Sequence, residues 1–148
     1  MLAFAMLLQA GLIFAQGDTE KLLIGKWAVT EAEALLGPDI RPAEGAIEGM
    51  DSQLEFVKDK LLKAKFEFLN KNKFVYDVPD RDTRIEEGLW SLSGKHIRVT
   101  GGEADNIKTL MEIDITNIDV SNIEEKKIEL EVSQPPLIYK LSLTKQVD

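Results

Sequence analysis

Hydrophobic and polar residues alternate along most of the chain after residue 16. A period of two is typical of strands that bury one face. Trp27 and Val29, for example, alternate with Lys26, Ala28 and Thr30. The same alternation recurs to the end of the chain. It predicts eight strands, over residues 22–30, 64–69, 73–78, 84–92, 95–100, 107–118, 126–132 and 137–145.

One stretch between the first two predicted strands has a helical period instead. Its apolar residues recur three and four positions apart, as in an amphipathic helix. They are Ile47, Met50, Leu54, Val57 and Leu61. Ser52 and Glu55 fit a capping box, so we expect a firm helix to begin there. Glycines at positions 45 and 49 favour a loop or a loose turn over residues 43–50.

Short turns join the predicted strands in sequence. The segment Asn70-Lys71-Asn72 follows the second strand, and asparagine tolerates the left-handed conformation that a tight hairpin needs. Eight sequential strands favour a meander, and closing such a sheet removes its exposed edges. We therefore predict a mainly β protein. It is an eight-stranded antiparallel up-and-down barrel with one helix between the first and second strands.

Length, charge and residue types narrow the range of functions. The chain has 148 residues, a length typical of one domain. Its 18 Lys and Arg against 26 Asp and Glu give a formal charge of −8. This charge argues against nucleic acid and against an anionic lipid surface as partners. The chain has no cysteine and a single histidine, which excludes disulfides, thiol chemistry and His-rich metal sites.

The first fifteen residues differ from the rest, because they carry no charge and are apolar except for Gln9 and Gly11. Such a run is shorter than the roughly 20 residues of a membrane span. It fits the apolar region of a secretory signal that is cleaved after Ala15. A buried N-terminal helix is the alternative. We expect a signal peptide over residues 1–15 and one domain over 16–148, exported to the periplasm or outside the cell, with no membrane span in the mature chain.

Four segments carry a family resemblance. They are LIGKWAVT (23–30), FEFLNKNKFVYDV (66–78), EEGLWSLSGKHIRVT (86–100) and YKLSLTK (139–145). Together they resemble small exported bacterial lipocalin-like proteins, and two of them contain Gly-x-Trp. The resemblance implies a lipocalin barrel of the calycin type, in which Trp27 closes one end and a basic residue of the last strand packs on it. This chain offers Lys140 or Lys145 for that role, where the family has arginine.

Large side chains of the inward-facing phase form the candidate ligand site. They are Trp27, Phe66, Phe68, Phe74, Tyr76, Trp90, Met111 and Tyr139. An apolar pocket with a few phenol groups is the usual composition of a small-ligand site. A packed core is the alternative interpretation. Because Lys140 is the only charged residue considered for this phase, we expect a ligand that is neutral or only weakly anchored.

The sequence shows no arrangement of catalytic residues. His96 alternates with Ile97 and Val99 and is expected to face away from the interior, and no Gly-x-Ser-x-Gly motif is present. The acidic residues between Asp77 and Glu87 lack the spacing of an EF-hand loop and are expected to be solvated. We therefore predict no enzyme, no catalytic residue, no cofactor and no metal.

Two functional hypotheses are compatible with these features. The first is a binding module for a small apolar ligand inside the barrel. The second is a structural or interaction barrel of the cell envelope, with a filled interior and a protein partner. The volume of the interior discriminates between them, because small-ligand sites measure about 300 Å³ or more.

Overall fold

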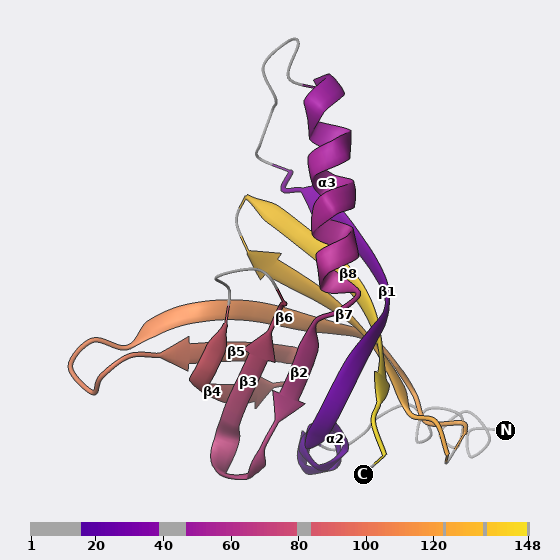
Figure 1. Ribbon diagram of the computed structural model, residues 1–148. Coiled ribbons are helices and arrows are strands. Elements are labelled where there is room, and N and C mark those ends of the chain that lie inside the picture. Colours follow the sequence, from indigo (N-terminus) through magenta and orange to yellow (C-terminus); the bar gives the residue numbers. More distant parts are fainter. Residues whose placement is uncertain (1–15, 39–46, 80–83, 123, 135, 148) are drawn as a thin grey trace, which may run out of the picture.

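A computed structural model describes residues 16–38, 47–79, 84–122, 124–134 and 136–147 of the chain (Figure 1). The predicted signal peptide, residues 1–15, lies outside the described residues, and so do Asp80 and Asp82 of the acidic run. The described part folds around one continuous hydrophobic core. Among these residues, no helix has both the length and the apolar character that crossing a membrane takes.

Eight antiparallel strands form a closed barrel in which each strand pairs with its neighbours in sequence and β1 pairs with β8. This arrangement confirms the predicted up-and-down barrel. The strands are β1 (Gly25–Leu36), β2 (Lys65–Phe68), β3 (Lys73–Asp77), β4 (Ile85–Ser93), β5 (His96–Gly101), β6 (Lys108–Asp119), β7 (Lys127–Gln134) and β8 (Leu137–Lys145). A short 3-10 turn, η1 (Asn70–Asn72), joins β2 to β3, with Lys71 and Asn72 at positive φ as the hairpin needs.

The first strand differs from its prediction at both ends. Residues 22 and 23 belong to a helix, α2 (Gln16–Leu23), and β1 begins at Gly25 and continues to Leu36. A register shift between Val29 and Glu31 explains why the sequence pattern ends early. Such a bulge adds one residue and changes which residues face inward. Trp27 and Val29 are buried before the shift, whereas Ala34 is buried after it.

Helix α3 (Ile47–Leu61) lies against the half of β1 that β2 leaves unpaired. Strand β2 pairs with β1 only over residues 25–28, whereas β8 follows β1 as far as Leu36. The helix buries Val57 and Leu61. In Figure 1, α2 lies at the start of β1 and α3 flanks its far half, so the two helices mark opposite ends of this strand.

The start of α3 differs from the prediction. The helix begins at Ile47, so Ser52 lies inside it, and the expected start at a capping box is wrong. Residues 47–50, expected as a loop, are helical. Gly49 disfavours a helix by only about 1 kcal/mol relative to Ala, which is too little to end a helix that Val57 and Leu61 anchor. Residues 43–46 of that expected loop lie outside the described part of the chain.

Candidate functional site

Five aromatic side chains from β2, β3 and β4 pack against one another inside the barrel. Register places Phe66 opposite Tyr76 and Phe68 opposite Phe74. Ring centroids are 4.9 Å apart for Phe66 and Tyr76 and 5.1 Å apart for Phe68 and Phe74. Trp90 meets Phe68 edge-on at 5.3 Å. These separations lie in the favourable range for aromatic pairs, so this part of the interior is held by ring packing.

The other three residues of the predicted interior set are also buried. Trp27 lies near the start of β1, and Met111 lies near the start of β6. Tyr139 pairs with Ala34 of β1 and Val132 of β7, in the part of the barrel that α3 flanks. All eight residues of the predicted interior set are therefore buried. Their role in lining a ligand site stays a prediction.

One end of the barrel is closed by α2 together with Trp27 and Lys145. The indole Nε1 of Trp27 donates a hydrogen bond to the Leu23 carbonyl at 2.8 Å. The Lys145 ammonium lies 5.6 Å from the Trp27 ring centroid and donates to the Leu22 carbonyl at 2.8 Å. The two carbonyls belong to the last turn of α2, where a helix leaves carbonyls unpaired. The cation that packs on Trp27 is thus Lys145.

Lys140, the other lysine considered for this role, lies on the exposed face of β8. It stands in register between Glu33 of β1 and Glu131 of β7. With Glu31 and Glu129, these residues line a polar cleft of about 390 Å³ on the outside of the sheet. Within the described ranges, no group of three or more His, Cys, Asp or Glu side chains is arranged to hold a metal ion.

The glycine of the first Gly-x-Trp motif has a clear structural reason. Gly25 has a φ of +140°, a conformation that L side chains rarely adopt, and a Cβ there would lie 2.7 Å from Cε of Lys145. The glycine therefore leaves room for the aliphatic stem of Lys145 to pass over the backbone of β1 and reach α2. Burial lowers the pKa of Lys145, and the nearby charge of Lys126 lowers it further.

The second Gly-x-Trp motif works in a similar way on β4. A Cβ on Gly88 would lie 2.8 Å from Cγ2 of Ile85 and 3.2 Å from Cγ1 of Val99. The indole of Trp90 donates to the Leu69 carbonyl at 3.3 Å. In both motifs a neighbouring side chain packs closely on the glycine, and the tryptophan donates a hydrogen bond to a carbonyl outside its own strand.

An apolar groove lies at the other end of β1, between α3 and the ends of β1 and β8. Its volume is about 520 Å³, within the range of small-ligand sites. Seven of its nine lining residues are apolar, and no charged residue lines it among the described residues. The lining residues are Leu36, Met50, Ser52, Gln53, Leu54, Phe56, Val57, Pro136 and Leu137.

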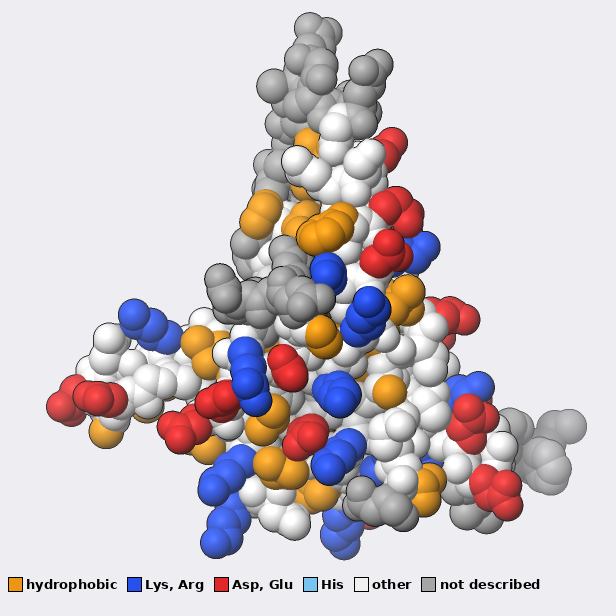
Figure 2. Space-filling view, in the orientation of Figure 1, with side chains coloured by type: hydrophobic (Ala, Val, Ile, Leu, Met, Phe, Trp, Pro, Cys, Tyr) orange, Lys and Arg blue, Asp and Glu red, His pale blue; other side chains and the backbone are white. Residues whose placement is uncertain are grey.

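Phe56 forms an exposed edge of this groove. Its side chain is 58% exposed, which is unusual for a large aromatic residue. The Lys60 ammonium lies 5.3 Å from the Phe56 ring centroid, one helical turn further along α3. Figure 2 shows hydrophobic side chains and lysines side by side over α3. Ser52 and Gln53 add hydroxyl and amide groups, so the groove combines an apolar wall with a few polar contacts.

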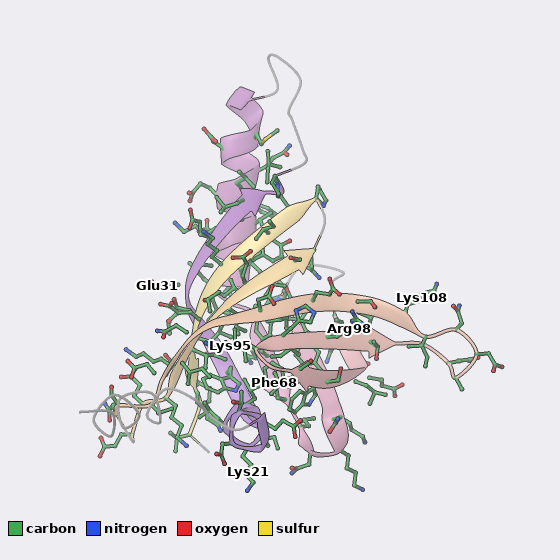
Figure 3. The ribbon with its side chains drawn as sticks, turned by 180° about the vertical axis from the view of Figure 1, so that it is seen from behind. Lys21, Glu31, Phe68, Lys95, Arg98 and Lys108 are labelled. Atoms are coloured by element: carbon green, nitrogen blue, oxygen red, sulfur yellow. The ribbon has the colours of Figure 1, made fainter. Side chains whose placement is uncertain are left out.

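His96 faces outward from β5, as predicted. Its Nδ1 lies 2.8 Å from Oδ1 of Asp114, and its Nε2 lies 3.8 Å from Oε1 of Glu112. Arg98, on the same outer face, lies 3.5 Å from that Glu112 oxygen (Figure 3). His96 is thus a surface residue of the strand, with hydrogen-bonding neighbours on β6.

Comparisons with known proteins give no relative. No protein-family model, no curated protein and no solved structure matches the chain. The resemblance to lipocalin-like proteins therefore stays a prediction, and the barrel itself rests on the structure.

Sequence reasoning missed the groove because it missed one of its walls. The pattern predicts the helical stripe of Met50, Leu54 and Val57, but it ends the first strand at residue 30, whereas β1 continues to Leu36. Glu and Ala are poor strand formers, which weakened the signal there. An alternation of Glu31, Ala32, Glu33 and Ala34 was still present and marks the strand in retrospect.

Proposed function

We propose that the protein is a binding module for a small apolar ligand, and that its site is the groove between α3 and the ends of β1 and β8. The observation that carries this proposal is the 520 Å³ volume with its apolar, uncharged lining among the described residues. Met50 adds an adaptable wall, because methionine fills irregular shapes and tolerates different ligands. The proposed site therefore lies outside the barrel interior, which is where the sequence predicted the ligand to bind.

The second candidate is a structural or interaction barrel with a filled interior. It is favoured by the mutual packing of the five aromatic rings of β2, β3 and β4. This packing fills part of the barrel interior but does not occupy the groove. The two candidates therefore differ in whether the groove binds a small ligand. A protein partner in the cell envelope belongs to this second candidate.

Export is part of the same proposal. It is supported by the uncharged apolar run over residues 1–15, which precedes the first described helix. A binding module of this kind would act in the periplasm or outside the cell. N-terminal sequencing of the protein recovered from those compartments tests this, and a start near Gln16 is expected.

Binding of the uncharged fluorescent dye Nile red tests the groove. We expect saturable binding to the wild-type protein and its loss in Leu137→Asp, because a carboxylate placed on the groove wall opposes an apolar ligand. Leu110→Asp is the matched control, since Leu110 is 41% exposed on β6 and outside the groove. Circular dichroism verifies that both variants are folded. Equal dye binding by both variants would contradict the proposed site.

A further inference from the structure

Charge is distributed unevenly over the surface of the protein. Between Leu62 and Lys73 the chain has four lysines and one carboxylate, although its overall formal charge is −8. Acidic residues gather elsewhere, for example in the glutamates that line the polar cleft outside β1 and β7. Salt screens exposed charges over roughly 8 Å, so a large partner responds mainly to the side of the protein that faces it. The net charge therefore does not decide what the lysine-rich side can bind.

The four lysines of this segment lie along the β2–β3 hairpin. They are Lys63, Lys65, Lys71 and Lys73, and all four are exposed. Lys65 and Lys73 alternate with buried aromatic residues of β2 and β3, so they point away from the barrel interior. Lys63 lies in the turn before β2, and Lys71 lies in η1. Figure 2 shows Lys and Arg side chains over β2 and β3 on this side of the molecule. We call the four lysines the lysine face.

Two carboxylates share the outer side of this hairpin, and each stands opposite a lysine. Glu67 of β2 is in register with Lys26 of β1, and Asp77 of β3 is in register with Lys65. Opposite charges at such positions attract each other across the strands. Both carboxylates are half-buried, whereas the lysines are exposed. The outermost charges of the hairpin are therefore positive.

Exposed leucines adjoin the lysine face. Leu89 of β4 is 52% exposed and stands in register opposite Lys73 of β3. Side chains that are directly opposite on antiparallel strands share one side of the sheet, so Leu89 and Lys73 reach the same surface. Leu62 is 39% exposed and precedes Lys63 in the chain. Basic and apolar side chains together are typical of surfaces that bind at the interface of a bilayer.

We propose that the lysine face docks on a bilayer that contains anionic phospholipids, with the lysines at the headgroups and Leu62 and Leu89 at the boundary of the acyl chains. A bilayer fits better than a nucleic acid, because aliphatic side chains gain by entering the acyl boundary, whereas a phosphate backbone offers them only charged surface. The docking is peripheral. It goes beyond the proposed function and uses none of the residues that line the groove.

Flotation of the full-length protein with vesicles tests this docking. We expect binding to vesicles of equal parts phosphatidylcholine and phosphatidylglycerol and none to phosphatidylcholine alone, and high salt should weaken it. The double variant Lys71→Gln, Lys73→Gln should bind about 25-fold more weakly, which is about fivefold for each lysine near an anionic surface. Every variant keeps residues 1–15, so an affinity of that apolar segment for vesicles is common to all of them.

Two other lysines supply a matched control. Lys95 lies in the turn between β4 and β5, and Lys108 begins β6, so both are away from the β2–β3 hairpin (Figure 3). The double variant Lys95→Gln, Lys108→Gln removes the same charge and should bind like the wild-type protein. Circular dichroism verifies that all variants are folded. An equal loss in both double variants would attribute the binding to total charge and overturn the role of the lysine face.

The apolar part of the proposal has its own test. Leu89→Ala should weaken binding to the mixed vesicles about fivefold, because it removes side-chain surface from the interface. Unchanged binding in Leu89→Ala, together with equally tight binding of heparin by the wild-type protein, would make the lysine face a general polyanion site and contradict the bilayer as its partner. Absence of binding to the mixed vesicles would overturn the proposal outright. Nile red binding in the absence of vesicles reports on the groove separately.

Discussion

The helices at the two ends of strand β1 are held in place by different interactions. At its start, Trp27 and Lys145 make directional hydrogen bonds to the last turn of α2, and both side chains are fixed there. At its far end, α3 is held through apolar residues such as Val57 and Leu61. Apolar contacts are not directional, so a helix held by them can leave a gap on one flank. This difference explains why the groove lies beside α3 and why the α2 end serves as structural support.

Truncating Trp27 at the start of β1 and Val57 at the groove end should give the largest difference in the free energy of unfolding. Trp27→Ala is expected to lower the free energy of unfolding by about 3–5 kcal/mol, as for other buried aromatic residues. Val57→Ala at the groove end should cost about 1–2 kcal/mol, since it removes a smaller side chain next to an existing gap. Urea midpoints measure both values. A cost for Val57→Ala as large as that for Trp27→Ala would contradict the distinction.

Glycine-to-alanine substitutions at the two ends of β1 should change the free energy of unfolding in opposite directions. Gly25→Ala is expected to lower the free energy of unfolding by about 1–3 kcal/mol, because of its positive φ and the approach of Lys145. Gly49→Ala lies inside α3, where a Cβ meets nothing within 4 Å, and should raise stability. The expected gain is about 0.5–1 kcal/mol. Thermal unfolding of the two variants gives the signs directly, and the same sign in both would count against the contrast between the two ends.

Helix α3 should open more readily than the barrel strands. Its exposed residues outnumber its buried ones, whereas β5 buries Ile97 and Val99 in the core. Elements with little buried surface open locally before the whole protein unfolds. Hydrogen exchange should therefore show amides of residues 54–61 at least about tenfold less protected than those of 97–99. Equal protection would make α3 a fixed part of the barrel wall.

Removing the Lys145 charge should lower the stability modestly, with a defined pH dependence. Lys145→Met is expected to cost about 1–2 kcal/mol through the lost hydrogen bond to Leu22 and the contact with Trp27. The folded state lowers the pKa of Lys145 from 10.5, so the unfolded chain binds more protons between the folded pKa and 10.5. Stability that depends on this group therefore rises with pH through that window. The wild-type protein should gain stability relative to Lys145→Met between neutral pH and pH 10, and a relative loss would contradict the burial of this ammonium.

The sequence predicted the barrel well because its strands follow one simple rule. Burial on one face imposes a period of two, and from β2 to β8 the predicted bounds agree with the structure to within two residues. The rule failed at the bulge between Val29 and Glu31, where the extra residue changes which side chains face inward. It also failed at the start of α3, where tertiary packing outweighs the weak local preference of Gly49.

The candidate site was harder to predict than the fold. Inward-facing aromatic residues were identified correctly, but a sequence pattern does not distinguish a lined cavity from rings packed on one another. The groove depends on long-range placement, because Leu36 and Leu137 come from strands far apart in the chain. Phe56 was the available signal, as a large aromatic residue outside the apolar stripe of α3.

A ligand that binds in the groove beside α3 should leave the barrel interior unchanged. Two methionines report on these places, since Met50 lines the groove and Met111 is 2% exposed inside the barrel. We propose NMR of the protein labelled with ¹³C at the methionine methyl groups, titrated with decan-1-ol and assigned with Met50→Leu and Met111→Leu. We expect a saturable shift of the Met50 methyl signal and an unchanged Met111 signal. A shift of Met111 without Met50 would place the ligand inside the barrel and contradict the proposed site.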